Sequence, residues 1–310
     1  MTVLEAIQKS SDFLAKKGVD SPRLQTELLL AHLLKLPRMQ LYLNFERALS
    51  PAETDALREM IKRRGVREPL QHIVGSTSFC GLDITVNRHA LIPRPETELL
   101  AEEAWKFLQG RAGTELTRDS SELHAAAGSE SQPYPSTTLD FGTGTGCIAI
   151  AIAAKCPGAN IVALDISPEA LALAKTNAEK NQVADRIEFV HGDGFAAVGS
   201  ARSFDLIASN PPYIASAEIE TLQPEVRDFD PRGALDGGPD GLDFYRMLAK
   251  QAKPFLKPEG KVMLEFGDGQ AEDIRNIFQA ENWIVEAVKA DYSQRERILI
   301  AKISSSSSSS

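Results

Sequence analysis

Between Thr138 and Lys302 the chain alternates short apolar runs with helix-forming stretches, and this alternation limits the possible folds more than any other feature. Seven of the runs have the length and the β-branched or aromatic content of strands. They are Thr138–Phe141, Asn160–Asp165, Ile187–His191, Phe204–Ser209, Lys261–Phe266, Trp283–Val288 and Arg297–Lys302. Helical stretches such as Pro168–Lys180 separate most of them. The pattern predicts an α/β fold whose largely parallel sheet is covered by helices on both faces.

The first predicted strand ends in a glycine-rich turn. Asp140-Phe-Gly-Thr-Gly-Thr-Gly146 leads directly into an apolar helix that we expect over Cys147–Ala154. Glycine lets a backbone turn tightly and approach a ligand closely, so the turn is a candidate cofactor-binding loop. Its residues are Gly142, Thr143, Gly144, Thr145 and Gly146. No lysine follows as in a phosphate-binding GxxxxGK[ST] loop, and dinucleotide enzymes use similar turns.

Acidic residues stand at the ends of the next two predicted strands. Asp165 lies where a carboxylate can accept hydrogen bonds from both ribose hydroxyls, which fits NAD and S-adenosylmethionine equally. Asp193 and Gly194 follow the third strand, where an acid can accept a hydrogen bond from an adenine amino group. Open α/β sheets bind ligands outside the carboxyl ends of their strands, so we expect these residues to surround one ligand.

The fourth predicted strand stops abruptly at Asn210-Pro211-Pro212-Tyr213. Neither proline has an N–H to donate, so the strand ladder cannot continue through them. This motif falls on the same sheet edge as the glycine turn. We therefore take Asn210, Pro211, Pro212 and Tyr213 as candidates for catalysis and substrate binding, and Asn210 also for cofactor binding.

The chemistry of this motif suits a planar NH2 group. The side-chain carbonyl of Asn210 and the backbone carbonyl of Pro211 can accept both of its hydrogens, and Tyr213 can pack flat on an amide or a base. The nitrogen then faces an electrophile such as the methyl group of a sulfonium, with which it must lie in line and nearly in contact. Acceptors at the hydrogens stabilise the positive charge that develops during transfer. No His, Glu or Lys adjoins the motif as a base, so we expect the proton to leave after the methyl group has transferred.

The first part of the chain is predicted to be helical. Ser21-Pro22 and Ser50-Pro51-Ala-Glu53 are helix-start signals. Ile73-Val74 and Leu82–Val86 have strand composition, which predicts a short hairpin, and a helix is expected to start in Ile92–Glu98.

Composition limits the class of protein. Hydrophobic residues make up 43% and charged residues 25%, as in soluble globular proteins. No apolar run reaches the roughly 20 residues of a membrane span, and no signal peptide is evident. Cys80, Cys147 and Cys156 are widely spaced, which predicts neither a zinc site nor a disulfide framework and favours a reducing cytosol.

The net charge of −9 is divided unevenly, because residues 1–100 carry 14 Lys and Arg against 12 Asp and Glu (+2) and the rest carries 20 against 31 (−11). An acidic catalytic part suits a basic protein partner better than a phosphate backbone. The one basic cluster, Arg58–Arg67, is predicted to be a solvated helix face.

The glycine turn and the Asn-Pro-Pro-Tyr motif together resemble class I S-adenosylmethionine-dependent methyltransferases that act on a planar nitrogen. That group includes DNA adenine, ribosomal RNA guanine and release factor glutamine methyltransferases. Further strings resemble the release factor glutamine methyltransferase family in particular. They are Ser21-Pro22-Arg23, Glu27-Leu28-Leu29, Glu68–Gly75, Phe79 and Leu91–Glu98. Of these strings, Leu91–Glu98 best distinguishes this family from the other methyltransferases.

The resemblance implies a Rossmann-like seven-stranded sheet, a small all-helical N-terminal domain and a β-hairpin linker. The corresponding domains are residues 1–69, 70–92 and 93–303, with a flexible insert at 111–137 and a disordered serine tail at 304–310. It implies S-adenosyl-L-methionine as cofactor and class I peptide chain release factors as partners. The substrate would be the side-chain amide of the glutamine in their Gly-Gly-Gln motif. Stable nucleic-acid binding and membrane association are not expected, and the expected compartment is the cytoplasm.

The resemblance also assigns roles by motif position. Gly142–Gly146 would cradle the methionine part of the cofactor, Asp165 would hold the ribose, and Asp193 and Gly194 would border the adenine. Asn210–Tyr213 would hold the substrate amide. The family often has a bulky residue where this chain has Gly194, so Phe195 is a second candidate for the stacking surface.

Three other functions remain open at this stage. A nucleic-acid amino methyltransferase, acting on adenine or guanine, would predict a basic face around the cleft and strongly salt-dependent binding. A non-catalytic module that kept the fold would not bind the cofactor. An NAD-dependent oxidoreductase would leave the Asn-Pro-Pro-Tyr motif without a role.

Overall fold

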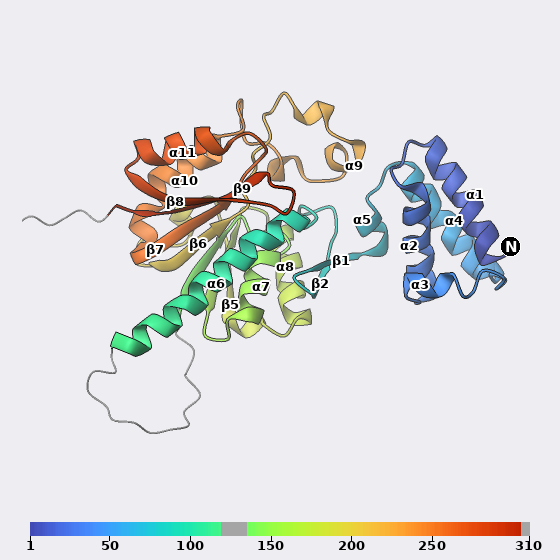
Figure 1. Cartoon of the computed structure of the whole chain (residues 1–310), viewed down its shortest axis with the longest axis horizontal. Coiled ribbons are helices and arrows are strands. Elements are labelled where there is room, and N and C mark those ends of the chain that lie inside the picture. Colours follow the sequence, from blue (N-terminus) through green and yellow to red (C-terminus); the bar gives the residue numbers. More distant parts are fainter. Residues whose placement is uncertain (119–134, 305–310) are drawn as a thin grey trace, which may run out of the picture. The chain divides into compact units, whose positions relative to one another are not determined.

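The computed structural model describes residues 1–118 and 135–304 of the chain, and these form two compact units (Figure 1). The helical unit comprises Met1–Ser76, Val86–Arg88 and Thr221–Asp230. The sheet unit comprises Thr77–Thr85, His89–Glu220 and the chain from Pro231 onward. A short segment from the second half of the sequence therefore belongs to the helical unit.

The helices of the helical unit are α1 (Val3–Lys16), α2 (Pro22–Leu34), α3 (Arg38–Leu41), α4 (Pro51–Gly65), α5 (Leu70–Val74) and α9 (Pro224–Arg227). Two of them, α2 and α4, begin at the predicted start signals. Ser50 and Glu53 form a capping box at the start of α4, because each side chain bonds the backbone N–H of the other. Buried leucines and isoleucines of α1, α2 and α4 form a separate apolar core.

The prediction that Arg58–Arg67 form a solvated helix face is wrong for Arg64. This residue of α4 is buried and only 3% exposed. The prediction failed because an acidic partner for Arg64 lies far away in the sequence.

The hairpin consists of β1 (Ser76–Phe79) and β2 (Leu82–Thr85). The prediction of a strand at Ile73-Val74 is wrong, because both residues belong to α5. Pro69 at the start of α5 and Gly75, whose φ is 88° at its end, limit this helix to a single turn. Ile73 is buried in the core of the helical unit, so its packing outweighs its β propensity.

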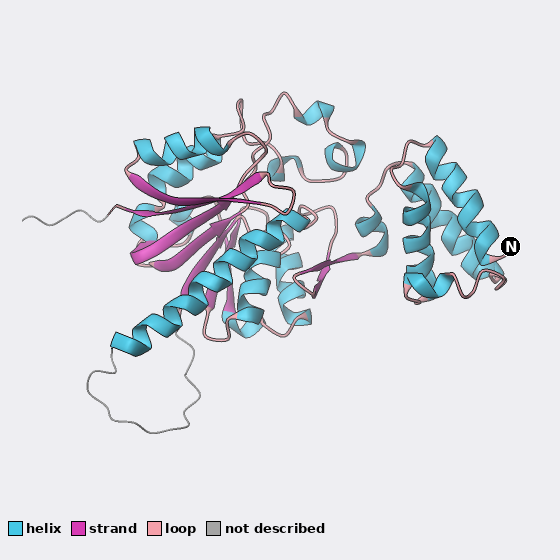
Figure 2. Ribbon diagram, in the orientation of Figure 1, coloured by secondary structure: helices cyan, strands magenta, loops and turns pink. Residues whose placement is uncertain are grey.

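The sheet unit contains the predicted seven strands, shown in magenta in Figure 2. They are β3 (Thr137–Phe141), β4 (Asn160–Asp165), β5 (Ile187–His191), β6 (Phe204–Ser209), β7 (Leu256–Glu265), β8 (Trp283–Ala290) and β9 (Glu296–Ile303). Their spatial order is β5-β4-β3-β6-β7-β9-β8. The first five strands pair in parallel, and β9 is antiparallel to both of its neighbours. The predicted largely parallel sheet is therefore confirmed.

Helices cover both faces of this sheet. Figure 1 shows α6 (Pro95–Arg118), α7 (Cys147–Lys155) and α8 (Pro168–Lys180) on one side, and α10 (Asp243–Gln251) and α11 (Ala271–Ala280) on the other. Nearly every residue of α7 is buried, which explains its uniformly apolar sequence. Five short 3₁₀ turns complete the described elements: Ala184–Arg186, Phe195–Ala197, Ile219–Thr221, Arg232–Ala234 and Lys253–Phe255.

The predicted flexible insert is corrected at its start. Residues 111–118 continue α6 as regular helix, residues 119–134 lie outside the described residues, and Thr137 already belongs to β3. Of the predicted serine tail, 305–310 also lie outside the described residues. Over the described parts of the chain, none of the helices has the length and apolar character needed to cross a membrane.

Candidate active site

A pocket of about 290 Å³ opens at the carboxyl ends of β3, β4, β5 and β6, within the sheet unit. This is the edge at which open α/β sheets bind ligands. Most of the residues selected from the sequence line it together. They are Gly142, Thr143, Gly144, Thr145, Asp165, Asp193, Gly194, Asn210, Pro211 and Pro212.

Two of the selected residues lie outside the lining of the pocket. Gly146 begins α7 with a φ of 81°, and a Cβ there would lie 3.0 Å from the Cβ of Ala174. Gly146 is therefore required for close packing between α7 and α8. Tyr213 packs its ring against Gly267, where a Cβ would lie 2.9 Å from the ring. Burial, and then the nearby Glu265, raise the pKa of Tyr213 to about 12, so its hydroxyl stays neutral.

The glycine turn and Asp165 hold each other in place. The Gly144 N–H donates to Asp165 Oδ2 at 2.8 Å, and the Ser167 N–H donates to Oδ1 at 2.9 Å. A carboxylate has about four acceptor positions, so Asp165 can still accept from a ligand in the pocket.

A second carboxyl group supports the turn from below. Asp140 is fully buried, and its Oδ2 accepts from Thr143 Oγ1 at 2.6 Å and from the Ala149 N–H at 3.1 Å. Burial raises its pKa to about 6, although these two hydrogen bonds lower it in part. Asp140 thus joins the turn to the start of α7 without lining the pocket.

The structure separates the two candidates for the surface beside Asp193. Gly194 lines the pocket, whereas Phe195 is only 2% exposed and belongs to the core of the sheet unit. Its ring lies between those of Phe141 and Phe255, at centroid distances of 5.0 and 4.8 Å. Phe195 therefore offers no stacking face to the pocket, and that alternative is wrong.

The orientation of Asn210 is fixed by a residue from α6. Asn210 Nδ2 donates to Thr97 Oγ1 at 3.0 Å, and the Thr97 residue is only 2% exposed. Glu265, at the end of β7, is equally buried and hydrogen-bonds to Thr97 and Asn210. The Nδ2 group donates into this network and so fixes the amide plane, which leaves Oδ1, the acceptor of the amide, for a substrate.

Glu265 is an unusual carboxyl group. Burial, and to a smaller extent Glu96, raise its pKa to about 7 against the opposite effects of Thr97, Arg297 and Asn210. Its Oε2 is a buried atom without a hydrogen-bond partner among the described residues. A carboxyl group in this state ionises near neutral pH.

The sequence did not assign roles to several residues of the site. Thr97 lies in the Leu91–Glu98 string that suggested the family, but the string alone gave it no function. Glu265 had only the weak signal of an acid at a strand end. Pro231, Gly233 and Ala234 line the pocket without belonging to any recognisable motif.

Comparisons with known proteins first define the class. Residues 129–224 match the family model described as "Methyltransferase small domain". The catalytic domain of hMettl16, solved in complex with MAT2A 3′UTR hairpin 6, aligns with a TM-score of 0.51 at 15% identity, over 82% of this chain and 83% of that one. At this identity the alignment shows the fold alone. The chain is a methyltransferase with a Rossmann-like fold.

Full-length relatives then define the family. Residues 5–75 match the "PrmC N-terminal domain" model. The release factor glutamine methyltransferase of Geobacter sulfurreducens is 44% identical over 89% of this chain and 88% of its own length. That of Chlorobaculum tepidum is 40% identical over 96% and 95% of the two chains. The chain belongs to the release factor glutamine methyltransferase family.

Proposed function

We propose that this protein transfers a methyl group from S-adenosyl-L-methionine to the glutamine side-chain amide in the Gly-Gly-Gln motif of class I peptide chain release factors. The observation that carries the proposal is the orientation of Asn210. Its Nδ2 is engaged by Thr97, so its Oδ1 can accept a hydrogen bond from an NH2 group in the pocket. Such a substrate is consistent with the cytoplasm as the compartment.

The pocket suits the proposed cofactor. A Cβ at Gly142 would meet no atom within 4 Å, so the turn leaves open space beside it for a ligand. The Asp165 carboxylate at the next strand end retains acceptor positions for ribose hydroxyls. Asp193 and Gly194 would border the adenine, and the glycine turn would hold the methionine part. When bound, S-adenosylmethionine supplies a methyl group on a positively charged sulfur.

The residues of the chain prepare the amide nitrogen for this methyl group. Asn210 Oδ1 and the Pro211 carbonyl would accept its two hydrogens and fix its plane. As the N–C bond forms, positive charge develops on the nitrogen, and the two acceptors stabilise it more than they stabilise the ground state. The cofactor would supply the methyl group without its bonding electron pair, and the nitrogen would then give up one N–H proton to solvent.

The function is tested by single-turnover transfer of labelled methyl groups. The acceptors are a class I release factor, the same factor with alanine in place of the Gly-Gly-Gln glutamine, duplex DNA and ribosomal RNA. We expect label on the unmodified factor alone. Label on nucleic acid would instead support an amino methyltransferase of that substrate and contradict the proposal.

The role of Asn210 is tested with the same assay. Asn210→Ala should lower the transfer rate much more than it lowers cofactor affinity measured by calorimetry, because it removes an acceptor for the substrate amide. An unchanged transfer rate would contradict this role.

A further inference from the structure

The chain crosses between the two units a short distance beyond the Asn-Pro-Pro-Tyr motif. It leaves the sheet unit after Glu220, contributes Thr221–Asp230 to the helical unit, and returns at Pro231. We call Thr221–Asp230 the crossing segment. Its helix α9 is a single turn, and none of its side chains is buried. The position of α9 therefore depends strongly on polar contacts.

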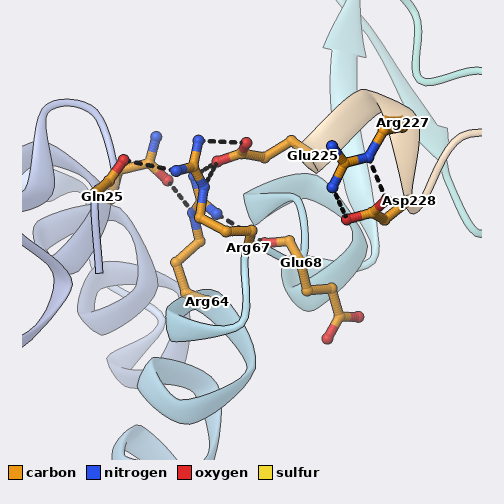
Figure 3. Close-up of polar contacts among 8 residues, drawn as sticks. Gln25, Arg64, Arg67, Glu68, Glu225, Arg227 and Asp228 are labelled. Atoms are coloured by element: carbon orange, nitrogen blue, oxygen red, sulfur yellow. Dashed lines mark hydrogen bonds and ion pairs between the residues drawn. The ribbon is translucent and has the colours of Figure 1, made fainter. Parts of the chain in front are cut away.

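Glu225 in α9 binds two arginines that lie at and just beyond the end of α4 (Figure 3). Its Oε1 accepts from Arg64 Nη2 at 2.7 Å and from Arg67 Nε at 2.6 Å. Its Oε2 accepts from Arg67 Nη2 at 2.6 Å. The contact with Arg67 is bidentate, the geometry in which arginine and carboxylate bind most strongly. We call these three residues the Glu225 clamp.

The clamp is more protected than an ordinary surface ion pair. The side chains of Arg64 and Glu225 are 4% and 16% exposed. Burial raises the pKa of Glu225, but hydrogen bonds from Arg67 and Arg64 outweigh it, so the pKa lies below its usual value. Glu225 is therefore ionised at neutral pH.

Both arginines are held by the helical unit itself. Arg64 Nε donates to Gln25 Oε1 at 3.0 Å, and its Nη1 donates to the Glu68 carbonyl at 3.2 Å (Figure 3). Arg67 Nη1 donates to the Gly18 carbonyl at 2.7 Å. These contacts fix the guanidinium groups before Glu225 binds, so little side-chain entropy is lost when the clamp closes.

The residues that follow the crossing segment form a wall of the pocket. Pro231, Gly233 and Ala234 line it, and we call Pro231–Ala234 the wall segment. On its far side the chain is fixed to the motif, because the Ile214 N–H donates to the Leu235 carbonyl at 3.0 Å and the Gly237 N–H to the Ile214 carbonyl at 2.9 Å. Along the chain, the wall segment thus lies between the Glu225 clamp and Leu235–Gly237, where backbone hydrogen bonds fix the chain.

We propose that the Glu225 clamp is a positioning device that anchors the crossing segment and so restrains the wall segment that follows it along the chain. Glu225, Arg64 and Arg67 contact no reacting atom. They fix α9, from which the chain runs on to Pro231 at the start of the wall segment. Just beyond the end of that segment, backbone bonds join Leu235 and Gly237 to Ile214, the residue that follows the substrate motif. Only the effect on methyl transfer rests on the proposed function; the effect on the wall segment does not.

The first test measures amide hydrogen exchange in the full chain. Glu225→Gln keeps the shape of the side chain and removes its charge. We expect amide exchange at residues 232–236 to become about tenfold faster, between the small effect of an exposed ion pair and the large effect of a buried one. Exchange in β3 and β6 should not change. Glu225→Asp, which keeps the charge, should show a smaller increase.

A double-mutant cycle separates the clamp from general destabilisation. If Arg67 acts through Glu225, Arg67→Gln combined with Glu225→Gln should accelerate exchange no more than Glu225→Gln does alone. The matched control is the exposed pair of Asp55 and Arg58 on the same helix, 2.6 Å apart. Asp55→Asn and Arg58→Gln should leave exchange at the wall segment as in the wild type.

Methyl transfer to a release factor provides the second readout. Glu225→Gln should lower kcat roughly tenfold, with a smaller effect on KM for the factor, because only the position of the wall segment is changed. Wild-type exchange at residues 232–236 in Glu225→Gln would overturn the clamp, whatever the activity. Faster exchange there would support it even if the wild-type chain methylated no release factor, a result that would contradict the proposed function alone.

Discussion

Thr97 is the residue through which the active site can be perturbed most cleanly. Its Oγ1 accepts from Asn210 Nδ2 at 3.0 Å, and it also hydrogen-bonds to the buried Glu265. Thr97→Val replaces the hydroxyl with a methyl group of similar volume, so the packing is largely kept while both hydrogen bonds are lost. Thr97→Ser retains the hydroxyl and is the matched control.

The expected magnitude follows from the groups left behind. A buried polar group that loses its partner costs about 1–3 kcal/mol, so Thr97→Val should lower the free energy of unfolding by about 2 kcal/mol. The hydrogen bond that orients Asn210 contributes about 1–1.5 kcal/mol, which corresponds to a roughly tenfold lower kcat if the amide can then rotate. Cofactor affinity should change little, because the contacts of the glycine turn and Asp165 do not involve Thr97.

The assay combines single-turnover methyl transfer to a release factor with calorimetric titration of the cofactor and urea unfolding. Thr97→Ser should behave nearly as the wild type in all three measurements. The reasoning would be refuted if folded Thr97→Val transferred the methyl group at the wild-type rate. It would also be refuted if Thr97→Ser were as slow as Thr97→Val, since the hydroxyl would then not be the cause.

Three further predictions follow from single residues. Asp165→Ala should weaken binding of S-adenosylmethionine by at least about tenfold in calorimetry, because it removes a charged acceptor; equal affinity would contradict the ribose assignment. Burial raises the pKa of Glu265 from 4.5 to about 7, so the folded protein holds this proton more tightly than the unfolded chain. The stability this provides is complete below pH 4.5 and is lost as the pH rises through about 7, a loss of about 3 kcal/mol. The free energy of unfolding, measured with urea, should therefore decrease less between pH 5 and pH 8 in Glu265→Gln than in the wild type. Equal decreases would exclude Glu265 as the source of this pH dependence. Gly146→Ala should lower the free energy of unfolding by about 2–4 kcal/mol, and Gly142→Ala by only about 1 kcal/mol. Both residues have a positive φ, but only a Cβ at Gly146 would meet neighbouring atoms. Equal losses in thermal unfolding would disprove this account.

Local sequence determined the strands, the helix starts and the cofactor edge of this protein. The apolar run Phe204–Ser209 stops just before Asn210-Pro211, and the described strand has the same limits. The start of α4 was readable because a capping box needs only Ser50 and Glu53, three residues apart. Strands that run in parallel end at a common edge, so the order of motifs along the chain already grouped Asp165 and Asn210 near the glycine turn.

Tertiary structure decided how individual side chains are used. Phe195 adjoins a lining residue, yet it packs into the core because Phe141 and Phe255 lie on either side of its ring. Gly146 stands in the cofactor turn but serves the packing of α7 on α8. Spacing in the sequence cannot distinguish a side chain that lines a pocket from one that turns away from it.

Long-range pairs were the least predictable part. Asn210 meets Thr97, and Arg67 meets Glu225, across more than a hundred residues of sequence in each case. A polar side chain has no periodic pattern that indicates its partner, because a hydrogen bond requires only that two groups meet in the folded chain. The sequence by itself determined where the ligand edge would form, and only the folded structure showed which residues orient Asn210 and hold the wall beside it.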